Sequence, residues 1–243
     1  MPVGSRGPEG MEAEGSGPAK STLWGRIRTR VKMFQDQTTN LGLERMLGVS
    51  LVSKFKREII FFHKDLRKPL PEVDPIPELT WRKVGEEDAG LMKEINPALV
   101  PGLVGQRLAR GELGWIFFFD RTPAHYLWQI FETTYLDYLG LSMSIGRGEV
   151  LHQSAFTRRE FRRMGISSYA RIQMFAFSRE QGFHRSMASV AWWNHPSSRG
   201  LVKRCQMEPF GSVIRWGWGS LATTKTTGHL VTTARGELRV DLP

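Results

Sequence analysis

The sequence predicts an α+β protein in which helices flank a central, mostly antiparallel sheet, preceded by an N-terminal helical extension. Strand-like runs and segments with helical spacing are mixed along the chain. The strand candidates Gly114–Asp120 and His125–Glu132 are separated only by a turn-forming Arg-Thr-Pro-Ala stretch, which favours an antiparallel hairpin. A chain of 243 residues with 40% hydrophobic content can bury one core of roughly 150–200 residues.

Composition limits the classes of protein that this chain can belong to. Charged residues make up 24% of it, which is ordinary for a globular protein. The single cysteine, Cys205, excludes an intrachain disulfide and a thiolate zinc cage, so we expect a reducing compartment and no metal site. The N-terminus has no apolar run typical of a signal peptide, and nowhere do 18 apolar residues run together. We therefore expect a soluble cytoplasmic protein, or one that touches membranes only from the side.

The N-terminal part of the chain is basic. The net charge is +10, and residues 1–68 hold 13 Lys/Arg against 7 Asp/Glu. Residues 1–22 are rich in Gly, Pro, Glu and Ser, so we predict a disordered tail there. Residues 23–68 are predicted to form a basic extension of two helices and one strand.

The first helix of this extension has two unlike faces. Apolar side chains recur on one side and basic ones lie elsewhere: Trp24, Ile27, Val31 and Phe34 against Arg26, Arg28, Arg30 and Lys32. Such a helix either packs on its domain, which is the commoner case, or lies on an anionic membrane surface. The second alternative would place the protein peripherally on the inner face of the membrane.

A proline-rich segment divides the rest of the chain. Residues 69–78 carry four prolines, which preclude a regular helix, so we predict an extended linker and a domain boundary. The main domain then covers residues 79–218, and residues 219–243 form a tail with short strands. We expect strands at Glu58–His63, Thr80–Val84, Gly114–Asp120, His125–Glu132, Glu149–Thr157, Ser186–Trp193, Phe210–Trp218, His229–Thr233 and Leu238–Val240. We expect helices at Glu86–Ile95, Pro101–Arg110, Ile166–Gln181 and Ser197–Cys205.

The most informative stretch is the turn between the strand at 149–157 and the helix that follows it. A helix N-terminus presents unpaired backbone N–H groups and partial positive charge, which together favour phosphate. Gly165 lets the backbone approach an anion closely, and the small Ser167 permits tight helix–strand contact. Four cations suited to a diphosphate or a 3′-phosphate lie here: Arg158, Arg159, Arg162 and Arg163. The turn alone also fits a basic loop that binds nothing.

The same turn resembles the Arg/Gln-x-x-Gly-x-Gly/Ala signature of the GNAT superfamily of acyl-CoA N-acyltransferases, with Arg162 first, Gly165 fourth and Ser167 sixth. Downstream, REQGFHRSMASVAWWNHPSSRGLVKRC is similar to the second half of that family's pattern: helix, Gly, strand, Asn, small residues and a short helix. The resemblance covers roughly residues 79–218. The sequence departs from the pattern at three places, one of which is Gln206-Met207, where the family has Gly-Phe after the last helix. Ser167 replaces the final Gly or Ala, and Leu201 stands where many members carry a tyrosine that acts as a general acid.

The resemblance implies a GNAT-like central sheet whose fourth and fifth strands splay apart around acetyl-CoA or another acyl-CoA. In this chain those strands would be 149–157 and 186–193. It also implies that a primary amine attacks the thioester directly, which makes the protein an N-acetyltransferase or a related N-acyltransferase. The residues expected to bind coenzyme A are Phe156, Arg162, Arg163, Met164, Gly165, Ile166, Ser167, Asn194 and Ser198.

An amine must be neutral to attack a thioester, so a general base is expected, acting directly or through water. The candidates are Glu132 at the end of its strand, and Glu149 and His152 on the cofactor strand. Because side chains alternate along a strand, Glu149 and His152 face opposite ways, and at most one faces the cofactor. His195 is a fourth possibility. The sequence does not choose among them.

Two other classes of function remain open at this point. Leu201 favours a module that binds coenzyme A without catalysis. The isoelectric point of about 10.1 favours a basic protein that binds nucleic acid or membrane, although no nucleic-acid-binding motif is present. The acceptor amine, the acyl chain length and the oligomeric state are not specified by the sequence.

Overall fold

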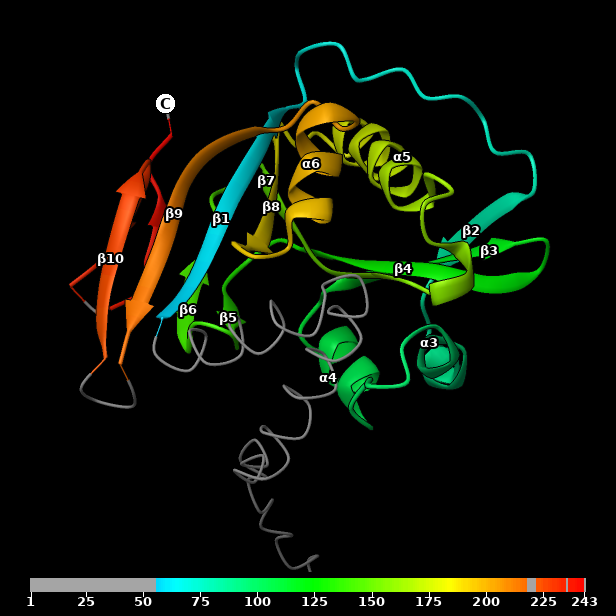
Figure 1. The fold of residues 1–243 in the computed structure, drawn as a ribbon, viewed down its shortest axis with the longest axis horizontal. Coiled ribbons are helices and arrows are strands. Elements are labelled where there is room, and N and C mark those ends of the chain that lie inside the picture. The colour runs from blue at the N-terminus through cyan, green and yellow to red at the C-terminus, as the bar shows by residue number, and fades with distance from the viewer. Residues whose placement is uncertain (1–55, 218–221, 235, 243) are drawn as a thin grey trace, which may run out of the picture.

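The computed structural model describes residues 56–217, 222–234 and 236–242, and Figure 1 shows their arrangement. The tail predicted at residues 1–22 and the two helices predicted before residue 55 lie outside this part, so the choice between packing and membrane contact for the first helix lies outside it as well. No helix in the described part is both long and apolar enough to span a membrane.

An eight-stranded sheet forms the centre of the fold, in the order β10-β9-β1-β8-β7-β4-β3-β2. All of its neighbouring strands are antiparallel except β7 and β8. The strands are β1 (Lys56–Asp65), β2 (Leu79–Lys83), β3 (Leu113–Phe119), β4 (Thr122–Ile130), β7 (Glu149–Thr157), β8 (Arg185–Ala191), β9 (Glu208–Trp216) and β10 (Thr223–Gly228). This confirms the predicted α+β class with a mostly antiparallel sheet.

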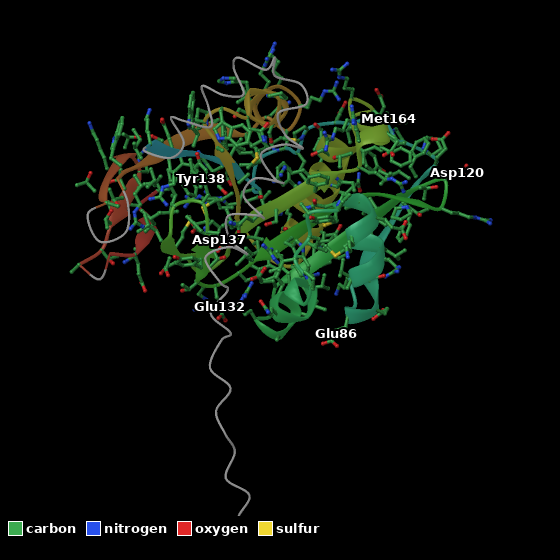
Figure 2. The ribbon with its side chains drawn as sticks, turned by 60° about the horizontal axis from the view of Figure 1, so that its bottom comes forward. Glu86, Asp120, Glu132, Asp137, Tyr138 and Met164 are labelled. Atoms are coloured by element: carbon green, nitrogen blue, oxygen red, sulfur yellow. The ribbon has the colours of Figure 1, made fainter. Side chains whose placement is uncertain are left out.

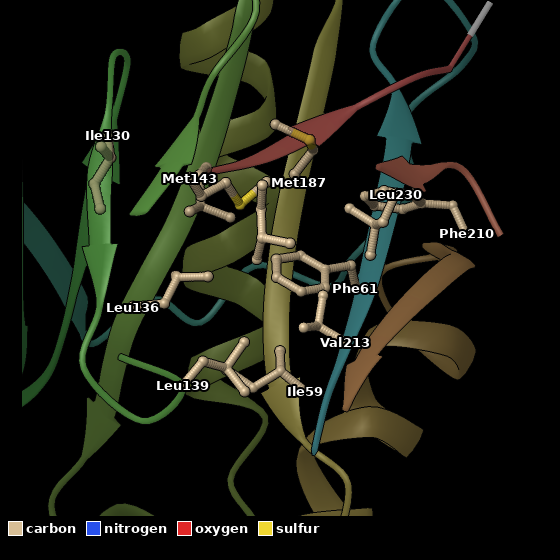
Figure 3. Close-up of a cluster of buried hydrophobic side chains, with 12 residues drawn as sticks. Ile59, Phe61, Ile130, Leu136, Leu139, Met143, Met187, Phe210, Val213 and Leu230 are labelled. Atoms are coloured by element: carbon tan, nitrogen blue, oxygen red, sulfur yellow. The ribbon is translucent and has the colours of Figure 1, made fainter. Parts of the chain in front are cut away.

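A second, four-stranded sheet packs against one face of the first, in the order β11-β12-β6-β5. Its strands are β5 (Thr134–Leu136), β6 (Leu141–Ser144), β11 (Leu230–Thr232) and β12 (Leu238–Val240). Buried apolar side chains from both sheets meet between them, among them Phe61 and Met187 from the large sheet and Met143 and Leu238 from the small one. Figure 3 shows this cluster.

The helices lie on both faces of the large sheet. On the face away from the small sheet lie α5 (Ile166–Glu180) and α6 (His195–Lys203). On the other face, α3 (Ala89–Ile95) and α4 (Leu103–Ala109) cover β3 and β4, where they bury Trp128 and Tyr126. The half of the sheet that carries the predicted cofactor strand is thus enclosed by helices on one face and by the small sheet on the other.

The strand predicted in the N-terminal extension belongs to the large sheet. β1 lies between β8 and β9, with Ile59 opposite Ala191 on one side and Val213 on the other. The proline-rich linker therefore joins two strands of one sheet, rather than separating an extension from a domain. The reason is visible in the sequence: an apolar run without alternation, EIIFFH, is typical of a strand buried on both faces.

The structure differs from the other sequence expectations in local detail. The hairpin between β3 and β4 turns at Asp120 and Arg121, which both have positive φ, so Thr122 and Pro123 already belong to β4. Strands β5, β6 and β10 were not expected, because they are short or rich in threonine and glycine.

Side chains are tightly packed around Gly114 of β3, on the face of the sheet that α3 and α4 cover. A Cβ at this position would lie 2.8 Å from the Cβ of Val84 and 3.0 Å from the Trp128 ring, whereas a Cβ at Gly105 of α4 would meet nothing within 4 Å. We expect Gly114→Ala to lower the free energy of unfolding by about 1–3 kcal/mol through overpacking. The matched Gly105→Ala should leave it unchanged or raise it by up to about 1 kcal/mol. Urea unfolding of the two variants checks this, and equal stabilities would contradict the packing described.

Candidate active site

The two parallel strands of the large sheet separate halfway along their length. β7 pairs with β8 only from Glu149 opposite Arg185 to His152 opposite Ala188. Beyond that point β7 continues beside β4, and β8 continues beside β1. We call the region past His152 and Ala188, where the two strands no longer pair, the fork. It confirms the splayed strands that the resemblance implied.

A bulge in β7 accompanies the fork. The register against β4 shifts between Tyr126 and Trp128, and Ser154 has φ of +52°. The buried Arg107 fixes the bulge, since its Nη2 donates to Ser154 Oγ at 2.7 Å while its Nη1 donates to Glu112 at 2.9 Å. The bulge therefore rests on an ion pair supplied by α4 and the segment after it.

The turn after β7 places the N-terminus of α5 at the open end of the fork. Gly165 is the N-cap residue, with φ of +82°, and no described side chain caps the helix. This left-handed conformation favours glycine, as the sequence motif requires. The uncapped first turn leaves backbone N–H groups directed outward, which is a favourable arrangement for an anion.

The arginines around this turn have different surroundings. Arg162 is held in place: its Nε donates to Thr157 O at 3.1 Å, and its guanidinium lies 5.4 Å from the centre of the Phe156 ring. Arg163 is exposed, and so is Met164. A further cation comes from the end of α6, because the guanidinium of Arg204 lies 3.1 Å from the point where a Cβ of Gly165 would stand. Sequence reasoning missed Arg204, which no motif connects to the turn.

The residues expected on α6 have structural roles in the described chain. Asn194 caps α6 by accepting from the Ser197 N–H at 3.4 Å, and its carbonyl accepts from the Ser198 N–H at 3.1 Å. Asn194 follows β8 as the N-cap of α6 and Ser198 lies within α6, so both are on the β8 side of the fork. Leu201 is buried in the core beneath the helix, among Phe62 and Phe175.

Two of the four candidate bases lie at the closed end of β7, away from the open fork. Glu149 is buried, and its carboxylate accepts from Arg185 at 2.5 Å and from the Gly146 N–H at 3.0 Å. Glu132 is exposed and follows Ile130, which pairs with Leu151, so it too lies at the level where β7 and β8 are still paired. In Figure 2, Glu132 lies well apart from Met164 of the turn. His195 is exposed at the start of α6.

His152 stands at the apex of the fork, and a buried network determines its protonation. The indole N–H of Trp115 donates to Gln129 Oε1 at 2.6 Å, and an indole can only donate. The amide orientation of Gln129 follows from this contact, so its Nε2 donates to Ser178 Oγ at 2.8 Å and to His152 Nε2 at 3.1 Å. The proton of the neutral imidazole must therefore be on Nδ1, which has no partner among the described residues.

The electrostatic surroundings keep this imidazole neutral. Complete burial lowers the pKa of His152 well below its usual value, and the nearby charge of Arg171 lowers it further. His125, also buried on the α5 face, has its pKa lowered to about 3 by the same two causes in the same order. With Nε2 occupied and Nδ1 protonated, His152 presents a hydrogen-bond donor at the fork. It is not arranged as the general base that the sequence suggested.

Solved structures with a similar fold include N-acetyltransferases. A GCN5-related N-acetyltransferase from Sphaerobacter thermophilus aligns with a TM-score of 0.50 and 14% identity over 74% of this chain and 56% of its own. A putative GNAT-family acetyltransferase from Novosphingobium aromaticivorans aligns with a TM-score of 0.48 and 14% identity, over 71% of this chain and 65% of its own. This chain thus spans less than two thirds of each. No protein-family model and no curated protein matches the sequence. The fold is that of the GNAT N-acetyltransferases.

The two buried histidines make stability depend on pH. The pKa values of both histidines are lower in the folded state than the ordinary value of about 6.5. Below pH 6.5 the unfolded chain therefore binds protons at these two residues that the folded chain does not bind. Stability is thus fully present above pH 6.5 and falls as the pH decreases. We expect each histidine to remove about 2 kcal/mol between pH 7 and pH 5.

Chemical unfolding at pH 7 and at pH 5 measures this difference. In His152→Gln, which removes one of the two titrating groups, the difference between the two pH values should fall by about half. An unchanged difference would show that His152 is not buried as a neutral group.

Proposed function

We propose that this protein is an acyl-CoA-dependent N-acyltransferase that transfers an acyl group to a primary amine. One observation carries the proposal: an uncapped helix N-terminus with a left-handed glycine stands at the open end of two parallel strands that have separated. Helix amides and arginines favour the phosphates, and the strands past the fork have unpaired inner edges for an extended arm. The GNAT fold supports the same assignment.

In this proposal the described residues divide the binding of coenzyme A among them. The first amides of α5, with Arg163 and Arg204, would hold the diphosphate. Backbone groups of β7 near Phe156 would hold the pantetheine arm, with Asn194 and Ser198 on the side of β8. The thioester supplies an activated acyl carbon: the amine nitrogen bonds to it, the carbon–sulfur bond breaks, and coenzyme A leaves as the thiol with the proton that the amine gives up.

The two buried candidate bases, Glu149 and His152, are not arranged to take that proton at the fork, and Glu132 lies at its closed end. Glu149 is ion-paired, His152 is a donor, and Leu201 replaces the tyrosine that the family resemblance would place there. We therefore infer that the amine reacts in its neutral form drawn from solution. Thiol release from acetyl-CoA, followed with a thiol reagent against a panel of primary amines, tests for transfer. The rate should rise with pH up to the pKa of the amine itself.

Substitution at the N-cap of α5 tests the cofactor site. Gly165→Glu should abolish coenzyme A binding in calorimetric titration, because the added carboxylate would lie where the diphosphate binds. Gly182→Glu is the matched control. Gly182 follows the other end of α5, also has a left-handed φ of +84°, and would place its Cβ in open space. The control should bind normally, and equal binding by both folded variants would refute the site.

Arg204 gives an independent test of the same site. Its removal in Arg204→Ala should weaken coenzyme A binding by about tenfold or more, since a charge-assisted hydrogen bond is worth roughly 1.5–3 kcal/mol. Arg199→Ala, on an exposed position of the same helix, should have little effect. Comparing coenzyme A with dephospho-coenzyme A shows which phosphate Arg204 meets: a contact with the diphosphate gives the same loss for both. Normal binding by Arg204→Ala would show that its position beside Gly165 serves packing alone.

A further inference from the structure

A cavity opens between the two sheets at the end where β7 and β8 begin. Its volume is about 620 Å³, and residues of both sheets line it. Glu149 and Arg185, which are the first residues of these two strands, form a buried ion pair in its wall. The segment after β1, the turn before β7 and strand β12 contribute the rest of the lining. A cavity of this size is typical of a site for a small organic molecule.

This cavity is separate from the candidate active site. Side chains alternate along a strand, so the next residues on the face of Glu149 and Arg185 are Leu151 and Met187, which pair with each other. Both are completely buried in the cluster between the sheets (Figure 3), where they separate the cavity from the fork. The turn at Gly165 lies beyond the other end of β7, whose 9 residues span about 30 Å. A ligand in this cavity would therefore occupy a place of its own.

Arginines from three separate parts of the chain stand at the mouth of the cavity. Arg67 follows β1, Arg147 lies in the turn before β7 and Arg239 belongs to β12, and all three are exposed. Arg67 is already paired, because its Nε and Nη2 donate to Asp65 at 2.9 and 3.0 Å. The side chains of Arg147 and Arg239 have no ion pair or hydrogen bond in the described part of the chain. These two guanidinium groups are available to a ligand.

The carboxylates in the lining do not balance these charges. Glu149 is neutralised by Arg185. Glu237 accepts from Ser144 Oγ at 3.5 Å and forms no ion pair with a described residue. Once the paired groups are set aside, two guanidinium groups face one carboxylate, so the cavity has an excess of one positive charge. A single anionic group balances this excess, and the planar donors of arginine match a carboxylate.

The remaining wall of the cavity is apolar. Ile145, Val240 and Leu242 line it and pack against the buried cluster between the sheets. They are only partly buried, so a ligand with an apolar body would remove further apolar surface from water. The cavity thus combines an apolar wall with one unbalanced positive charge.

We propose that this cavity is a second ligand site, which binds a small organic acid with one carboxylate and an apolar body. Arg147 and Arg239 would bind the carboxylate, and Ile145, Val240 and Leu242 would contact the body. This site goes beyond the proposed acyl transfer and does not depend on it.

Three probes test the site on the full-length protein by ligand-observed NMR titration. 3-Phenylpropionate has both features, 3-phenylpropionamide lacks the charge, and acetate lacks the apolar body. We expect 3-phenylpropionate to bind at least about fivefold more tightly than either of the others. In the double variant Arg147→Gln/Arg239→Gln, its affinity should fall to that of the amide. Both arginines are exposed, so this variant should fold normally. Arg121→Gln, at an exposed position of the β3–β4 hairpin, is the matched control and should bind like the wild type.

Each contrary outcome has a distinct meaning. No binding of 3-phenylpropionate, equal binding of its amide by the wild type, or an unchanged preference in the double variant would overturn the proposal. Acetate that binds as tightly as 3-phenylpropionate would also overturn it, by showing a basic surface without an apolar site. Displacement of the probe by coenzyme A would place the probe at the fork and overturn the second site. The double variant should bind coenzyme A as the wild type does, so failure of this inference leaves the acyltransferase proposal intact.

Discussion

The fork depends on backbone hydrogen bonding at the outer edges of its two strands. A strand that leaves its neighbour exposes N–H and C=O groups, and inside a protein such groups need partners. Here β7 is held by β4 and β8 is held by β1 on the sides away from the fork. Each strand thus remains fully ordered while its inner edge is free. The rest of the candidate site follows from this arrangement, since the turn that starts α5 and the cap that starts α6 are the direct continuations of the two separated strands.

Features encoded in contiguous sequence were predicted, and features made by distant residues were not. The fold class and the turn at Gly165 could be inferred because glycine, arginine and a change from strand to helix periodicity lie within a few residues of one another. Arg204 was not predicted because only the packing of α6 on α5 brings it close to the turn at Gly165. The tautomer of His152 depends on Trp115, Gln129 and Ser178, which come from three different elements. The hydrophobic periodicity of the sequence does not predict such a hydrogen-bond network, because strand register and helix placement determine which side chains meet.

Helix α5 carries two buried polar residues, Arg171 and Ser178, between the apolar side chains that pack it on the sheet. Two apolar flanks attach it to the sheet, while its centre carries a charge and a serine in place of further apolar contacts. Polar groups in the interior of a protein strengthen one another when they are satisfied and weaken the fold when they are not. The Gln129 network is satisfied except at Nδ1 of His152, which has no partner among the described residues.

The location of β1 also determines the order in which this protein can assemble. Both of its partners, β8 and β9, come from the last third of the sequence, so the ribosome has released β1 long before either neighbour exists. Until then, a strand that is apolar on both faces has no sheet to enter, and its unpaired edges are open to association with other chains. The large sheet can therefore be completed only late in synthesis, when β1 pairs with β8 and β9, which are distant from it in the sequence. Folding of this kind is slow compared with that of a helical protein of the same size.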